Sequence, residues 1–168
     1  MFHLLKFDLL WFAFRKLKLN KAPGVDGVSV EDYEANLRSN LLDLESRLQR
    51  GAYRPQPSLR RDIPKGNGKT RPLGIACVED KLVQRAAVMI LEQIYEVDFS
   101  DDSYGFRPGR SCHDALKTLG KNIGTKKVNF ISDSDIRAFF DEVDHDKLLE
   151  LLRIRISDQR LLRLVTRF

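Results

Sequence analysis

The side chains best suited to chemistry lie in one short stretch of the 168-residue chain, Asp133-Ser134-Asp135-Ile136-Arg137-Ala138-Phe139-Phe140-Asp141. The preceding residues, Val128-Asn129-Phe130-Ile131, are typical of a β-strand, and side chains two positions apart on a strand share a face. Asp133 and Asp135 are therefore expected on the same side of a strand end, where carboxylate oxygens can bind a divalent cation. The stretch predicts a metal site.

The same acids also have ordinary structural explanations, and both interpretations stay open at this point. Carboxylates that precede a helix are common N-caps, and Asp144 is well suited to that role. A calcium-binding EF-hand loop starting at Asp133 needs Gly and Glu where the chain has Ala138 and Asp144, which excludes that motif. A phosphohydrolase motif D-x-D-x-T needs Thr where Arg137 stands, so phosphatase chemistry is kept only as an alternative.

Composition favours a globular domain with an anionic partner. Hydrophobic residues make up 42% and charged residues 32% of the chain, which supplies enough apolar material for a core. The formal net charge is +5, and the sequence pI is near 9.3. An excess of positive charge between residues 50 and 71 is typical of phosphate contact, although a solvated basic face has the same composition. Against the single acid Asp62, this segment carries Arg50, Arg54, Arg60, Arg61, Lys65, Lys69 and Arg71.

The cysteines and histidines give no support for a zinc site. Cys77 and Cys112 are the only cysteines, no C-x-x-C pair occurs, and the histidines are scattered. We expect both cysteines to be buried structural thiols in a reducing compartment. The apolar helix predicted over residues 4–18 is interrupted by charges and carries no secretory cleavage signature. These features indicate an intracellular protein with no membrane partner, and the more specific expectation of a bacterial-type cytoplasm rests on the family resemblance described below.

Helices are predicted where apolar residues recur at helical spacing, and a β-hairpin where two strand-like runs flank a glycine-rich tip. The first predicted helix is apolar around most of its circumference, so the core or another chain must cover it. Ser29 and Ser111 are candidate N-caps, and Gly120 and Gly124 are expected to loosen the chain after a short helix. The predicted helices span 4–18, 29–49, 79–97, 111–119, 148–155 and 161–168, and the predicted strands 59–63, 70–75 and 128–133.

Two loops combine glycine with basic residues. The hairpin tip runs from Lys65 to Lys69, and it is not a P-loop, because Ile63 stands where that motif needs Gly and a strand follows in place of a helix. Its charges can still hold phosphates. The second loop, Ser103-Tyr104-Gly105-Phe106-Arg107-Pro108-Gly109-Arg110, interleaves aromatic and basic residues. That composition suits stacking and phosphate contact on a nucleic acid, or a packed turn.

Five motifs follow one another along the chain and cover it from about residue 11 onward. They are the basic-ended segment 11–21, Pro23-Gly24-Val25-Asp26-Gly27, Ile63-Pro64-Lys65 with Gly68-Lys69-Thr70-Arg71-Pro72-Leu73-Gly74-Ile75, the loop 103–111, and the acidic stretch 133–141. In type and order they resemble the reverse transcriptases encoded by group II introns, the maturase family. The chain resembles an N-terminal fragment of such a protein.

The resemblance implies a right-hand polymerase of the α+β class, helix-rich with a β-hairpin. A fingers subdomain is expected over residues 1–125 and the N-terminal part of a truncated palm over 126–168. The implied activity is that of an RNA-directed DNA polymerase, a nucleotidyltransferase that adds dNTPs to a DNA primer 3′-hydroxyl on an RNA template with two Mg²⁺ ions. The implied partners are the RNA template, the DNA primer, the dNTP and intron RNA.

Roles carry over to single residues by their positions in the motifs. Asp135 matches the catalytic palm aspartate that holds Mg²⁺, and the backbone carbonyl of Ile136 is the next expected ligand. Arg71, together with Lys65, matches the residues that clamp the nucleotide triphosphate. Phe139 or Phe140 matches the aromatic gate beneath the sugar, and the sequence leaves that choice open. The residues expected to contact nucleic acid are Arg60, Arg61, Lys69, Arg107 and Arg110.

The family's second palm motif, an aromatic-Ala-Asp-Asp turn with further metal ligands, does not occur in these residues, and neither do a thumb or an RNA-binding maturase region. Asp135 alone does not supply the ligands for two metal ions, so we expect residues 1–168 by themselves to be inactive, as a fragment or a truncated reading frame. Uncovered palm surfaces are then expected to drive homodimerisation. The alternative hypothesis is a non-catalytic RNA-binding or self-associating module.

Overall fold

The chain folds into a helix-rich structure with one antiparallel hairpin, which confirms the α+β class and the predicted hairpin. The computed structural model describes residues 1–18, 22–64, 66, 68 and 70–168. Its elements are η1 (Phe2–Leu4), α1 (Phe7–Arg15), α2 (Val30–Ala35), α3 (Leu37–Gln49), β1 (Leu59–Pro64), β2 (Thr70–Ile75), α4 (Val78–Tyr95), α5 (Cys112–Thr125), α6 (His145–Arg155) and α7 (Gln159–Val165).

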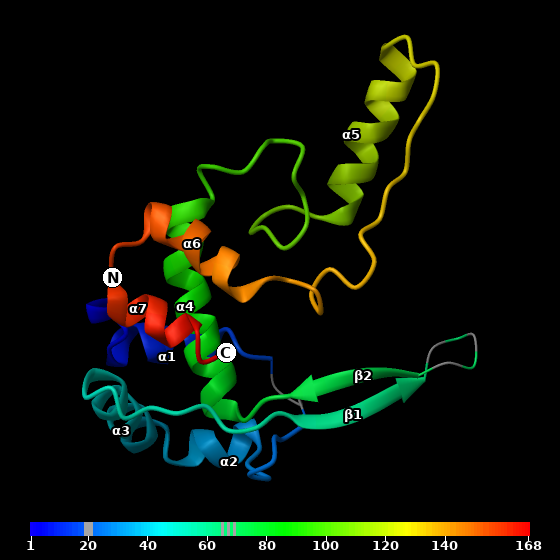
Figure 1. The fold of residues 1–168 in the computed structure, drawn as a ribbon. Helices are drawn as coiled ribbons and strands as arrows, with labels where there is room; N and C mark the ends of the chain where they lie inside the picture. The colour runs from blue at the N-terminus through cyan, green and yellow to red at the C-terminus, as the bar shows by residue number, and fades with distance from the viewer. Residues whose placement is uncertain (19–21, 65, 67, 69) are drawn as a thin grey trace.

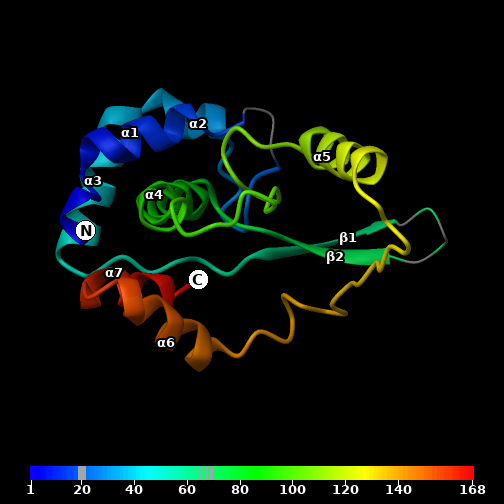
Figure 2. The ribbon, with the colours of Figure 1, turned by 90° about the horizontal axis from the view of Figure 1, so that it is seen from above.

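α4 is the helix around which the others pack. Leu82, Ala86 and Ile90 recur every four residues along it and are buried, as the predicted helical stripe requires. α1 contacts both α4 and α3. Seen end-on, α4 lies between the N-terminal helices α1 to α3 and the C-terminal helices α6 and α7, while the hairpin extends to one side (Figure 2).

One core joins the two ends of the chain. Residues of η1 and α1 are buried together with residues of α7, although more than 140 positions separate them in the sequence. Asp158 helps to close this junction, because its carboxylate accepts a hydrogen bond of 2.7 Å from the backbone N–H of Phe2. The buried side chains contributed by the chain after α5 are Ile156, Leu161, Leu162 and Leu164.

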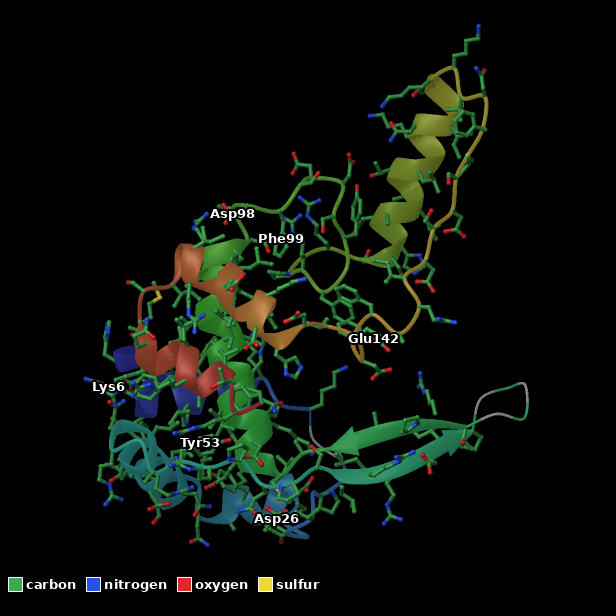
Figure 3. The ribbon with its side chains drawn as sticks, in the orientation of Figure 1. Lys6, Asp26, Tyr53, Asp98, Phe99 and Glu142 are labelled. Atoms are coloured by element: carbon green, nitrogen blue, oxygen red, sulfur yellow. The ribbon has the colours of Figure 1, made fainter. Side chains whose placement is uncertain are left out.

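A buried carboxylate lies in the first turn of α4. Asp80 is only 2% exposed. Its Oδ1 accepts from the Tyr53 hydroxyl at 2.5 Å and its Oδ2 from the backbone N–H of Gln56 at 2.9 Å. Burial, and then the bond to Asp80, raise the pKa of Tyr53 well above its ordinary value, so the hydroxyl stays a donor. These bonds fasten the extended chain after α3 to the N-terminal end of α4, beside which Tyr53 lies (Figure 3).

Beside Asp80, Glu79 ties α3 to the same turn. Arg47 of α3 donates from Nη2 to both carboxylate oxygens of Glu79, at 2.7 and 2.8 Å. The Tyr33 hydroxyl of α2 donates to Oε1 of Glu79 at 3.3 Å. Both acids lie at the positive end of the helix dipole, which favours negative charge there.

The Pro-Gly and Asp-Gly loop packs against the start of α4. A Cβ at Gly24 would lie 2.7 Å from Cα, N and Sγ of Cys77, the N-cap residue of α4. Only glycine fits this close approach without displacement of one of the two segments. Glycine is therefore required at position 24 because a side chain would collide with Cys77.

The helix caps agree with the sequence, but the helix lengths differ in places. Ser29 and Ser111 each form a capping box with an Asp three residues on, and Asp144 accepts from two backbone N–H groups. The single helix predicted over 29–49 is divided at Asn36 into α2 and α3. α5 continues through Gly120 and Gly124 to Thr125. Each glycine inside a helix lowers the stability of the helix by only about 1 kcal/mol relative to alanine.

Three further expectations are corrected by the structure. The strand predicted over 128–133 is absent from the described residues, because a strand needs a neighbour for its backbone groups and β1 and β2 pair only with each other. Cys77 is buried as expected, but Cys112 is exposed. The first helix is only partly covered, since Trp11 and Phe12 remain nearly half exposed.

α5 extends away from the helical core, and the chain from residue 126 to 144 returns from it alone (Figures 1 and 2). α5 and α6 contribute no buried residue. Within the part of the chain that the structure describes, no helix is long and apolar enough to cross a membrane.

Replacing Gly24 with Ala is expected to lower the free energy of unfolding by about 1–3 kcal/mol, because the new methyl group overlaps the backbone of Cys77. Urea denaturation measures this change. Gly120→Ala is the matched control, since open space surrounds that position within α5 and a helical alanine is favoured by up to about 1 kcal/mol. Equal stabilities of the two variants would contradict the close packing of the loop on α4.

Candidate nucleic-acid interface

The arginines of the hairpin lie on two opposite faces. Arg61 pairs with Leu73 and Ile63 pairs with Arg71 in the antiparallel register. Paired residues share a face and side chains alternate along each strand, so Arg61 and Arg71 lie on the same face of the hairpin. Both residues are exposed. This face can present two guanidinium groups to a phosphate chain or a triphosphate.

Arg60 lies on the other face. It alternates with Arg61 and shares its side with Asp62, whose carboxylate approaches the Arg60 guanidinium to 3.6 Å. Its charge is therefore partly compensated, whereas no ion pair to Arg61 or Arg71 is formed within the described residues. Lys65 and Lys69, which the sequence also assigns to this site, lie outside the described residues.

Arg107 serves the internal structure of the loop 96–110. Its side chain is only 6% exposed and forms an ion pair of 2.8 Å with Glu96. It donates to the carbonyls of Ser100 and Ser103 at 2.6 and 2.9 Å, and its guanidinium lies 5.2 Å from the Phe99 ring. A contact between Arg107 and nucleic acid stays a prediction, and this geometry leaves it few donors for one.

The rest of that loop is more open. Arg110 pairs with Asp101 and lies over the Tyr104 ring at 5.5 Å. Phe106 is 99% exposed and has a left-handed backbone, with φ of 58°. Such a conformation is uncommon for a bulky residue. The loop therefore presents an aromatic ring to solvent.

The acidic stretch forms an exposed turn. The carbonyl of Ala138, whose φ is 51°, accepts from the backbone N–H groups of Asp141 and Glu142 at 2.9 and 3.0 Å. Phe139 and Phe140 pack edge to face with centroids 5.4 Å apart. A shallow cavity here is lined by residues 134–136 and 138–141, so this cavity does not bring Asp135 and Arg71 together.

The residues near Asp135 do not make a complete metal site. Its carboxylate and the Ile136 carbonyl are oxygen donors of the kind that Mg²⁺ prefers. Among the described residues, however, no group of three or more Asp, Glu, His or Cys side chains is placed to hold an ion. The oxygen donors have the right chemistry for the implied metal but are too few.

Sequence reasoning missed a second group of basic residues. Arg160, Arg163 and Arg167 border one small cavity beside α7. Their spacing of three and four positions, at and just before the helix predicted over 161–168, was the available signal, because residues at this spacing lie on one face of a helix. They lie outside every motif that the resemblance covers.

Arg107→Lys is expected to loosen the loop 96–110, because Lys keeps the charge but lacks the planar fork that binds Glu96 and the carbonyls together. Backbone amides of the loop should exchange with deuterium several times faster than in the parent chain. Arg61→Lys, on the exposed hairpin, is the control and should leave this loop unchanged. Unaltered exchange in the Arg107 variant would show that the loop does not depend on its guanidinium.

The amino-acid sequence of this chain is similar to those of several known proteins. The family described as reverse transcriptase (RNA-dependent DNA polymerase) matches residues 63–166. Protein YkfC of Escherichia coli (strain K12) is 43% identical over 146 residues, which are 85% of this chain and 38% of that protein. Group II intron-encoded protein LtrA of Lactococcus lactis subsp. cremoris is 38% identical over 167 residues, or 99% of this chain and 28% of LtrA.

A plant relative matches over a shorter range. Nuclear intron maturase 1, mitochondrial, of Arabidopsis thaliana is 32% identical over 87 residues, which are 52% of this chain and 12% of the maturase. The chain thus spans well under half the length of each of these relatives. These matches confirm the resemblance noted from the motifs: the chain belongs to the reverse transcriptase (RNA-dependent DNA polymerase) family, and its relatives include group II intron-encoded proteins.

Proposed function

We propose that this chain provides the fingers and the first part of the palm of an RNA-directed DNA polymerase of group II intron type. Residues 1–125 form the fingers in this proposal and residues 126–168 the beginning of the palm. The observation that carries the proposal is the exposed face of the hairpin with Arg61 and Arg71, in a chain that belongs to this family. Two uncompensated guanidinium groups on one face suit a nucleic-acid backbone or a triphosphate.

The site roles follow from the motifs. Arg71, with Lys65 of the hairpin tip, binds the triphosphate of the incoming dNTP. Asp135 and the carbonyl of Ile136 contribute oxygen ligands toward Mg²⁺ once carboxylates from a longer polypeptide join them. When bound, the metal would offset the negative charge of the phosphates. Phe139 or Phe140 lies beneath the nucleotide sugar.

Residues 1–168 by themselves do not supply a complete acidic site in this proposal. With Asp135 lacking partners among the described residues, these residues do not extend a primer. The RNA template, DNA primer and dNTP are partners of the complete protein. Intron RNA is a further partner, in line with relatives whose names describe them as intron-encoded or as a maturase.

The second candidate function is a non-catalytic, RNA-binding or self-associating module. The uncovered apolar side chains of α5 favour it: Leu116, Leu119 and Ile123 lie at helical spacing and are exposed. The chain beyond α5 adds Phe130, which is 84% exposed. Surfaces of this kind are common in proteins that associate, so a homodimer is expected for residues 1–168. Light scattering that reports a strict monomer would contradict this expectation.

RNA binding by the hairpin is tested with two neighbouring arginines. Arg61→Gln is expected to weaken binding of a single-stranded RNA about threefold to tenfold and to reduce the salt dependence of log K by about 0.7. Arg60→Gln is the matched control, because Arg60 lies on the opposite face beside Asp62. Fluorescence anisotropy over a range of salt concentrations measures both. Equal losses in the two variants would contradict a role for one specific face.

Polymerase chemistry is tested by primer extension on an RNA template with Mg²⁺. Residues 1–168 are compared with a longer protein that adds a following aromatic-Ala-Asp-Asp segment, each with and without Asp135→Ala. We expect extension only by the longer protein with Asp135 intact. Inactivity of both proteins with RNA binding preserved would favour the non-catalytic module.

A further inference from the structure

A small cavity beside α7 is surrounded by arginine side chains. It has a volume of about 170 Å³ and lies between α7, the N-terminal residues and the chain after α3. Arg160, Arg163 and Arg167 border it, and the buried side chains of Phe2 and Leu164 contribute its apolar lining. Within the part of the chain that the structure describes, no acidic side chain lines this cavity.

Two of the three guanidinium groups are held in place by neutral partners. Arg160 donates from Nη2 to the carbonyl of Gln49 at 2.6 Å, and its guanidinium lies 4.3 Å from the Phe2 ring centroid. Arg167 donates from Nη1 to the carbonyl of Tyr53 at 2.8 Å. A carbonyl orients a guanidinium without cancelling its charge, and each guanidinium has five N–H donors, so most of them stay free. The positive charge around the cavity is therefore fixed in position and uncompensated.

Arg163 lies between these two in the sequence, on α7. Its side chain is exposed and forms no hydrogen bond or ion pair with any described residue. A ligand at the cavity can therefore recruit it without the loss of an internal contact.

The acid closest in sequence is already engaged elsewhere. The Asp158 carboxylate caps α7 by accepting from the backbone N–H groups of Arg160 and Leu161, and it also pairs with the chain's amino group at 3.1 Å. Burial alone would raise its pKa, but the hydrogen bond from the Phe2 N–H and the others lower the pKa to about 2. This acid is charged at neutral pH, and its charge is offset by the amino group.

Arg54 contacts the border of the cavity without lining it. It donates to the carbonyls of Gly51 and Tyr53, both of which line the cavity, at 2.9 and 2.8 Å. Arg54 itself lines a second cavity, which three carboxylate side chains also border. The positive charge at the first cavity therefore comes from Arg160, Arg163 and Arg167, and several guanidinium groups around one site suit the phosphate oxygens of a nucleic-acid strand.

We propose that the cluster of Arg160, Arg163 and Arg167 binds phosphodiester groups of a single-stranded RNA segment. The inference rests on the proposed function because the ligand is again RNA. It assigns a second RNA contact, in addition to the one at the hairpin. α7 and the strands β1 and β2 lie on different sides of the molecule (Figures 1 and 2), so the RNA segment that occupies this cluster is separate from the one at Arg61. Guanidinium forks match the geometry of phosphate oxygens.

Arg163→Gln tests the proposal, because Arg163 makes no side-chain bond to a described residue and its removal should leave the fold intact. Binding of a 12-nucleotide RNA is expected to weaken about threefold to tenfold, with a salt dependence of log K lower by about 0.7. Arg153→Gln, an equal loss of charge on the exposed surface of α6, is the matched control and should change affinity by less than about twofold. Thermal unfolding of both variants should match the parent chain.

A second arm separates RNA from free phosphate. Inorganic phosphate is titrated in a phosphate-free buffer while the backbone amides of α7 are followed by NMR. Shifts with phosphate and a selective RNA loss in Arg163→Gln support the proposal, whereas phosphate shifts with unaltered RNA affinity overturn it in favour of a small-anion site. Equal losses in Arg163→Gln and Arg153→Gln also overturn it. A loss in Arg61→Gln alone leaves the proposed function standing and refutes this second contact, and no loss in any variant refutes both.

Discussion

The fold depends on the buried carboxylate of Asp80 in the first turn of α4. A charge at a site only 2% exposed is stable only when hydrogen bonds replace its water, and Tyr53 and the backbone of Gln56 supply them. To reach Asp80, the chain after α3 must pass the start of α4, and that path leads directly into β1. The same turn holds α3 through Glu79 and the N-terminal loop through Cys77 and Gly24. The position of the hairpin is therefore set by one end of one helix.

Local features could be read from the sequence because they depend on neighbouring residues. Caps at Ser29, Ser111 and Asp144 and the presence of the hairpin follow from side-chain chemistry within a few positions. The strand expected at 128–133 failed because a strand depends on a partner, and residues 1–168 provide none for it in the described structure. Strand alternation therefore cannot be the feature that orients Asp133 and Asp135.

The candidate site was predicted only in part, for the same reason. Arg61 and Arg71 were named from their charge, but the pairing of β1 with β2 was needed to separate them from Arg60. Arg107 has the same residue type, yet its donors are used inside the loop 96–110, a contact that spacing does not reveal. The cavity beside α7 needed the tertiary fold, since residues near both ends of the chain form it.

A stable unit of α1, α3, α4 and α7, with weakly held segments from α5 to α6 attached to it, is the central physical claim. Native-state hydrogen exchange tests it most directly, because protection follows the free energy of local opening. Amides of α4 and α7 should exchange only through global unfolding, while those of α5 and residues 126–144 should exchange much faster. Equal protection in α5 and α4 would contradict the account, since α5 would then be part of the same cooperative core.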